Sequence, residues 1–177
     1  MKKGIQLLIV FFILQTIVSC CKEVEFFNFS SFSIQESSLE IATNQLLELE
    51  IFPDDLEYTS YLKDFGISQS YALDCDDGWG GAKYEIIDIQ VRSNSDFDST
   101  HLKGEYLDDL FVYKVYGDNE TVSFKSLTEL TKYELYHIDL KLLNSPKMDS
   151  LHQFEIIITK ENSETLISFS KDIKWVK

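Results

Sequence analysis

Arginine is nearly absent from this chain, and acidic residues outnumber basic ones. Arg92 is the single arginine, and 16 Lys and Arg residues stand against 30 Asp and Glu residues, which gives a formal net charge of −14. Binding to a nucleic-acid backbone depends on clustered Lys and Arg that neutralise phosphates. The composition therefore argues against a nucleic-acid partner, and it also argues against electrostatic attraction to anionic lipid headgroups.

The motifs of the common enzyme classes are missing as well. The sequence contains no G-x-S-x-G nucleophile elbow, no phosphate-binding loop, no G-x-G-x-x-G and no H-E-x-x-H. Its three histidines, His101, His137 and His152, do not lie at metal-ligand spacing from another His or Cys. We therefore expect a protein that is not an enzyme and that carries no metal or cofactor. A hydrolase that relies on carboxylates alone is the remaining enzyme alternative.

The start of the chain has the layout of an export signal. Lys2 and Lys3 precede an apolar run from Ile5 to Val18, as in a secretory signal peptide. At about 1.5 Å per residue this run makes a helix of about 21 Å, shorter than the roughly 30 Å that a transmembrane helix must cross. We therefore predict removal of residues 1–19, and loss of the two lysines would change the net charge from −14 to −16.

The end of the signal indicates how the chain is attached to the membrane. Ile17-Val18-Ser19-Cys20 resembles a bacterial lipobox, in which the cysteine receives lipid after cleavage. Cys20 fits better than Cys21, because the lipobox has Gly, Ala or Ser before its cysteine. We predict lipid attachment at Cys20 and an outer-membrane location, with acyl chains as the membrane contact. The alternative is an ordinary secretory signal that ends in a chance cysteine.

Residues 20–25 are expected to form the lipidated cysteine and a charged tether. Lys22-Glu23-Val24-Glu25 resembles the sorting tag of surface-displayed lipoproteins of the Bacteroidota, although Cys21 intervenes before it. A solvated tether explains the same residues equally well, since charge runs usually face solvent. The cell surface and the periplasmic face of the outer membrane therefore both remain open.

Cysteine is too sparse for a disulfide framework. If Cys20 is lipidated, Cys21 and Cys75 are the two cysteines that remain, in a compartment where disulfides form. The two can pair, but Cys75 follows a strand-like run and is more typical of a small buried apolar residue. The interpretation of Cys75 as a small buried residue is favoured over a disulfide with Cys21.

Alternation of apolar and polar residues dominates residues 26–177, which we predict to form a single domain. Strands with one buried face are expected at 47–51, 87–91, 136–142 and 153–176. The last range is expected to be a hairpin that turns at 161–164, with Ile167, Phe169, Ile173 and Trp175 continuing its buried face. His137 falls on the polar side of its strand and is predicted to face solvent.

The front of the domain is expected to be an edge strand. Phe27 and Phe29 alternate, and Phe32 resumes the pattern out of phase, as a bulge at Ser30-Ser31 would produce. Short helical segments are predicted at 107–111 and at 126–130, where Ser126 to Glu129 match a capping box. The fold class predicted from these elements is all-β, an antiparallel two-sheet sandwich of immunoglobulin-like type with one or two short helices.

One loop stands out as a candidate ligand site. Asp74, Asp76 and Asp77 lie beside a glycine-rich turn, and their oxygens would suit calcium. The register is wrong for an EF-hand, because Trp79 occupies the position of the required glycine. A plain polar loop is favoured, since Asp and Gly gather in turns. Trp79 is expected to cap the core, and stacking on a sugar ring is the alternative.

Several segments also resemble a family of small Bacteroidota lipoproteins without an assigned activity. They are Ala72–Cys75, Lys83–Val91, Ser93–Asp98 and Leu107–Phe111. The resemblance implies an all-β domain over most of the mature chain and lipidation at Cys20. It implies no functional residue.

Two functions from different classes then compete. The first is a non-enzymatic binding or accessory module of the cell envelope that takes a glycan, a peptide or a partner protein. The second is a structural subunit of an envelope or fimbrial complex, in which an edge strand such as residues 26–34 docks by β-addition.

Overall fold

The computed structural model describes residues 24–61, 81–116, 122–130 and 137–176. Contacts divide the chain into two units, one formed by residues 28–57 and 82–177 and the other by residues 1–27 and 58–81. Nearly all described residues belong to the first of these units, and the account below concerns that unit. The prediction of a single domain over residues 26–177 stays a prediction.

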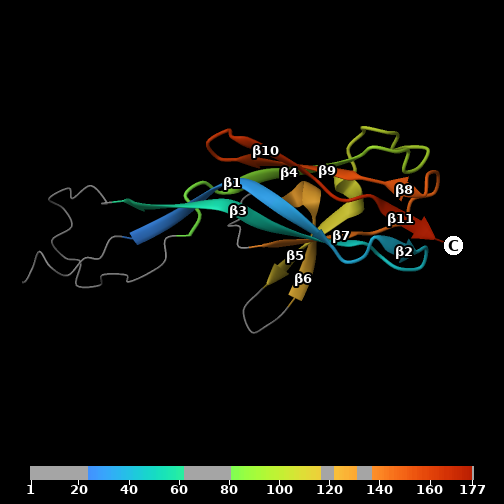
Figure 1. The fold of residues 1–177 in the computed structure, drawn as a ribbon, viewed down its shortest axis with the longest axis horizontal. Helices are drawn as coiled ribbons and strands as arrows, with labels where there is room; N and C mark the ends of the chain where they lie inside the picture. Colours follow the sequence, from blue (N-terminus) through green and yellow to red (C-terminus); the bar gives the residue numbers. More distant parts are fainter. Residues whose placement is uncertain (1–23, 62–80, 117–121, 131–136, 177) are drawn as a thin grey trace, which may run out of the picture. The chain divides into compact units, whose positions relative to one another are not determined.

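The described residues form strands joined by loops and short 3₁₀-helices (Figure 1). The strands are β1 (Val24–Glu36), β2 (Glu40–Ala42), β3 (Glu48–Tyr61), β4 (Ile86–Ser93), β5 (Phe111–Tyr116), β6 (Val122–Ser126), β7 (Ile138–Leu142), β8 (Leu151–His152), β9 (Phe154–Lys160), β10 (Thr165–Phe169) and β11 (Ile173–Val176). The helices are η2 (Asp108–Leu110) and η4 (Leu127–Glu129). The all-β fold class is confirmed, and so are the two short helical segments.

The strands are arranged in three sheets. A five-stranded sheet has the order β1-β3-β7-β5-β6, and two three-stranded sheets have the orders β10-β9-β4 and β2-β11-β8. The pairs β3–β7, β5–β7, β5–β6, β4–β9, β9–β10 and β8–β11 are antiparallel, whereas β2 and β11 are parallel. This arrangement agrees with the predicted antiparallel sandwich, with three sheets among the described strands in place of the two predicted and with one parallel pair.

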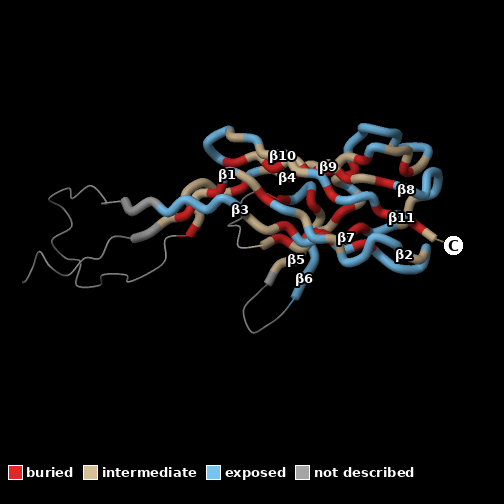
Figure 2. Tube along the Cα trace, viewed as in Figure 1, coloured by how far each residue is buried: buried red, intermediate tan, exposed pale blue. Residues whose placement is uncertain are grey.

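The core is built from the alternating apolar side chains of the strands. Leu49 lies opposite Leu140 in the β3–β7 pair, and Ile89 lies opposite Ile158 in the β4–β9 pair. Each of these four side chains is at most 1% exposed, and burying one contributes about 1.5–3 kcal/mol. Figure 2 shows the resulting alternation of buried and more exposed residues along β7 and β9.

The terminal hairpin is present, but one part of its prediction is wrong. β9 and β10 pair across the predicted turn, and the buried Ile173 and Trp175 belong to β11 in another sheet. Ile167 and Phe169, which were expected to be buried, are 54% and 58% exposed. The reason is the register, since even-numbered residues of β10 lie opposite the buried side chains of β9.

The first strand lies at the edge of its sheet, as predicted. Phe27, Phe29 and Phe32 are buried, so the buried face shifts phase after Phe29 in the expected way.

The capping box at Ser126 is not formed, because the hydroxyl of Ser126 bonds to that of Thr128 at 2.8 Å and η4 is a single 3₁₀ turn. Among the described residues, no helix is long and apolar enough to span a membrane.

Candidate functional site

The ligand loop predicted from the sequence lies outside the described residues. Asp74, Asp76, Asp77 and Trp79 fall within residues 62–80. Cys20 falls within residues 1–23, which are likewise not described. The roles predicted for these side chains stay predictions, and so does the interpretation of Cys75 as a small buried residue that does not pair with Cys21.

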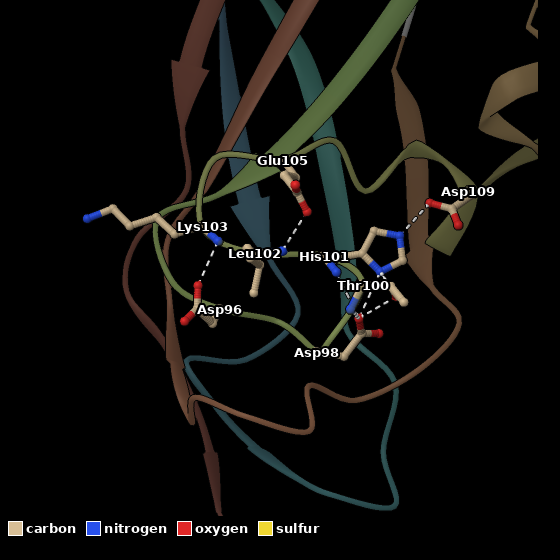
Figure 3. A network of polar contacts seen from close by, with 8 residues as sticks. All are labelled: Asp96, Asp98, Thr100, His101, Leu102, Lys103, Glu105 and Asp109. Carbon is tan, nitrogen blue, oxygen red and sulfur yellow. Dashed lines mark hydrogen bonds and ion pairs between the residues drawn. The ribbon is translucent and has the colours of Figure 1, made fainter.

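The loop between β4 and β5 contains a network of polar contacts around Asp98 and His101 (Figure 3). The Asp98 Oδ1 atom accepts hydrogen bonds from the backbone N–H groups of Thr100 and His101 at 2.8 and 2.9 Å, and from the Thr100 hydroxyl at 2.7 Å. The imidazole of His101 lies between two carboxylates. Its Nδ1 is 3.0 Å from Asp98 Oδ1, and its Nε2 is 3.2 Å from Asp109 Oδ1.

This network favours a charged histidine. Hydrogen bonds from Thr100 and His101 hold the pKa of Asp98 well below its usual range. Burial alone would lower the pKa of His101, but the hydrogen bond to Asp98 and the charges of Asp109 and Asp98 outweigh burial and raise that pKa. Both ring nitrogens are occupied by carboxylates, so His101 organises the loop and is not available as a base or metal ligand.

A second histidine forms a buried pair with a serine. The Oγ of Ser93 and the Nδ1 of His152 are 2.7 Å apart, and Nε2 of His152 lies 2.9 Å from the carbonyl oxygen of Asp149. We infer that Nε2 carries the proton and donates to this carbonyl, while the Ser93 hydroxyl donates to Nδ1. Burial lowers the pKa of His152, which favours the neutral form of the ring.

The Ser93–His152 pair has the atoms of a nucleophile and a base but no access for a substrate. Ser93 is 3% exposed and His152 is fully buried. The rings of Phe97, Phe154 and Trp175 lie 5.5 to 6.0 Å from the imidazole, centroid to centroid. The pair therefore joins β4 to β8 inside the core.

An open groove of about 430 Å³ lies beside β2 and the start of β3. Its polar side chains are already bonded within the protein. The Ser37 hydroxyl accepts the Glu48 N–H at 3.2 Å, and Lys141 Nζ lies 2.9 Å from Glu48 Oε1. The groove offers these groups to a ligand only at the cost of internal hydrogen bonds.

The free edge of β10 is a stronger candidate for binding. Hydrogen bonds at both ends of β10 fix which backbone groups face β9. The N–H of Lys160 donates to the Glu164 carbonyl at 2.9 Å, and the N–H of Ser170 donates to the Phe154 carbonyl at 2.8 Å. In an antiparallel pair, residues that bond to the partner strand alternate along the chain.

It follows that even-numbered residues of β10 bond to β9. The N–H and C=O groups of Thr165, Ile167 and Phe169 point to the other side, where no described strand pairs with β10. Ile167 and Phe169 are also the exposed apolar side chains of this strand. Ile167 and Phe169 therefore present both outward backbone N–H and C=O groups and exposed apolar side chains to a binding partner.

The sheet face that carries these side chains has two acidic residues and one basic residue. Phe169 lies opposite Glu155, and Glu155 lies opposite Arg92, whereas Asp88 lies in the row of Thr159 and Thr165. The guanidinium of Arg92 lies over the ring of Tyr106 at 4.2 Å and bonds to its hydroxyl. The face therefore has a slight excess of acidic residues.

The edge strands β6 and β1 are less open than β10. In β6, Phe124 is half exposed, but Lys114 lies opposite it and Lys141 Nζ lies 5.5 Å from its ring centroid. Charged side chains of this kind discourage pairing with another strand. In β1, the N–H of Phe27 donates to the Gly81 carbonyl at 3.1 Å, and the carbonyl of Phe29 accepts from Lys160.

Sequence patterns alone did not identify the β10 edge. Leu166, Ile167 and Phe169 make both faces of β10 apolar, so alternation does not show which face is buried.

His137 behaves as predicted, with 40% of its side chain exposed, and it stacks on Phe52 with ring centroids 6.0 Å apart.

Comparison with known proteins adds little to this description. No protein-family model matches the chain, and none of the curated proteins matches it. Solved structures that resemble it include a conjugative transposon lipoprotein from Bacteroides eggerthii, at 13% sequence identity, with 80% of this chain and 95% of that chain covered and a TM-score of 0.32. This likeness is too distant to establish a shared fold or function.

Proposed function

We propose that this chain is a lipid-anchored, non-enzymatic accessory module of the bacterial outer membrane that captures a partner protein at β10. The observation that carries the proposal is the free edge of β10, at which outward N–H and C=O groups coincide with exposed Ile167 and Phe169. The lipobox at Cys20 supports the anchored location.

The partner is an extended segment that adds a strand to the β10-β9-β4 sheet. Strand addition uses main-chain hydrogen bonds for affinity and alternate side chains for specificity. Ile167 and Phe169 select apolar side chains at every second position of the added strand. Because the chain carries a net charge of −14, a neutral or basic segment is favoured over an acidic one.

A structural subunit of an envelope or fimbrial complex is the second candidate, and it would use the same edge. The two functions differ in how long a partner stays bound at the edge of β10. An accessory module exchanges its partner, whereas a structural subunit stays assembled with one. The glycan-binding alternative depends on Trp79, which lies outside the described residues.

Replacement of Ile167 by proline tests the proposal. Proline removes an N–H that points away from β9, so the β9–β10 hydrogen bonds remain while an added strand loses a donor. We expect Ile167→Pro to lower partner recovery about tenfold, a change of about 1.4 kcal/mol in binding, when the anchored protein is crosslinked in intact cells and captured. Ile167→Thr keeps the N–H and should lose less.

Leu151→Thr is the matched control, because Leu151 is 51% exposed on β8 in another sheet. It should leave recovery unchanged. Thermal unfolding shows whether the proline variant is folded, and Thr165→Pro at the first residue of β10 replaces it otherwise. Equal recovery with the folded proline variant and the wild type would exclude β10 as the docking edge.

A further inference from the structure

Lys160, at the end of β9, has its amine completely buried next to an asparagine of β1. Its side chain is 0% exposed, and Nζ donates to Asn28 Oδ1 at 3.1 Å and to the backbone carbonyl of Phe29. Nζ also lies 4.1 Å from the ring centroid of Phe29. The third oxygen partner is Glu164 Oε2 at 3.0 Å.

These groups are the ones required to make an amide bond between two side chains. The reaction needs an amine next to a carboxamide carbon, a group that moves protons, and exclusion of water. Because Nζ lies 3.1 Å from the Asn28 oxygen and this oxygen lies about 1.23 Å from its carbon, the Lys160 amine lies no more than about 4.3 Å from the carbon that it would attack. The ring of Phe29 and the burial of Lys160 keep water away.

Glu164 is in position to act as the proton carrier. Its carboxylate lies within hydrogen-bond distance of Nζ, and 35% of its side chain is exposed, so it can exchange protons with solvent. The hydrogen bond from Lys160 lowers the pKa of Glu164, and the group therefore begins as a carboxylate that can accept a proton.

We propose that Lys160 and Asn28 form an intramolecular isopeptide bond with Glu164 as the proton-transfer residue. The ammonium of Lys160 gives one proton to Glu164, and the Nζ lone pair attacks Cγ of Asn28. Glu164 then passes this proton to Nδ2, the Cγ–Nδ2 bond breaks and ammonia leaves, while the attacking nitrogen gives its second proton to the Glu164 carboxylate, which releases it to solvent. The product is a secondary amide, and no oxidant or other reactant is consumed.

The bond would join residues 132 positions apart in the sequence. One of them is in the strand that follows the predicted tether, and the other is in the hairpin whose second strand is β10. Such a link closes a long loop in the unfolded chain and lowers its entropy. It would hold β1 to β9 when the anchored protein is pulled or heated, independently of what binds at β10.

Peptide mass spectrometry of the full chain purified from its membrane tests the proposal. In an unlinked chain, trypsin releases Asn28 within peptide 23–63 and Lys160 at the end of peptide 148–160. A linked Lys160 blocks cleavage at that position. We then expect peptide 148–171 joined to peptide 23–63, at a combined mass that is lower by one ammonia, about 17 Da.

Variants separate the linkage from ordinary hydrogen bonding. Asn28→Ala and Lys160→Arg should give no joined peptide. Glu164→Gln keeps both reacting side chains, and we expect its linkage to be about 100-fold slower or more. Asn44→Ala is the matched control, since Asn44 is exposed in the turn after β2 and lies in the same peptide 23–63 as Asn28, and it should link like the wild type.

Recovery of peptide 148–160 in full amount from the wild type, without any joined species, would overturn the proposal. Linkage of Glu164→Gln at the wild-type rate would overturn the role of Glu164.

Discussion

The surroundings of two histidines of this domain shift their pKa values in opposite directions. His152 is buried among aromatic rings, and burial lowers its pKa. His101 lies between Asp98 and Asp109, whose hydrogen bond and charges raise its pKa despite partial burial. The two residues therefore make opposite contributions to the pH dependence of stability.

We predict that His152 destabilises the fold as the pH falls. In the unfolded chain the imidazole has its ordinary pKa of about 6.5, so below that pH the unfolded state binds a proton that the folded state resists. The contribution to stability is fully present above pH 6.5 and falls toward the lowered folded pKa, with a slope of at most about 1.4 kcal/mol per pH unit.

Urea unfolding of the wild type and of His152→Asn between about pH 5 and pH 8 measures this contribution. The wild type should lose more stability than the variant as the pH falls. His101→Asn serves as the opposite case, because a raised pKa stabilises the fold below pH 6.5 and this stabilisation is lost as the pH rises through the folded pKa. Identical slopes for the wild type and His152→Asn would contradict the buried neutral histidine.

At the scale of the element, the β9–β10 hairpin has one strand in the core and one at the surface. Phe154 of β9 is fully buried and packs edge to face against Phe111 and Trp175, with ring centroids 5.9 and 6.2 Å away. Phe169 of β10 is 58% exposed. The same substitution should therefore have very different effects at the two positions.

We expect Phe154→Ala to lower the free energy of unfolding by about 3–5 kcal/mol, because it leaves a cavity that its neighbours fill only in part. Phe169→Ala should change it by no more than about 0.5 kcal/mol. Chemical denaturation of the two variants measures both values. A loss at Phe169 comparable to the loss at Phe154 would show that β10 packs into a core.

The same hairpin shows what the sequence can and cannot predict. Strict alternation at Leu49 and Ile51 was enough to identify a half-buried strand, because only one face is apolar. In β10 the register across the turn at residues 161–164 decides which face is buried. Because both faces of β10 carry apolar residues, the sequence does not indicate which one that is. The sequence also gives no local pattern that indicates the contact between Ser93 and His152, which lie 59 residues apart.

At the scale of the whole molecule, the net charge bears on the predicted lipid anchor. With residues 1–19 removed the net charge becomes −16, and anionic headgroups repel such a domain. We predict that Cys20→Ala abolishes lipid labelling and membrane retention, whereas Cys21→Ala retains both. Labelling with radioactive or clickable fatty acid, followed by membrane fractionation, checks this, and equal labelling of both variants would contradict the lipobox assignment.

The claim that partner capture occurs at β10 is tested most directly by a photo-crosslinker placed at Phe169 in intact cells. The control carries the same crosslinker at Phe124, which is similarly exposed at 50% on the lysine-flanked edge strand β6. The account predicts a discrete crosslinked partner from position 169 and none from position 124. Crosslinking of the same species from both positions, or from neither, would contradict it.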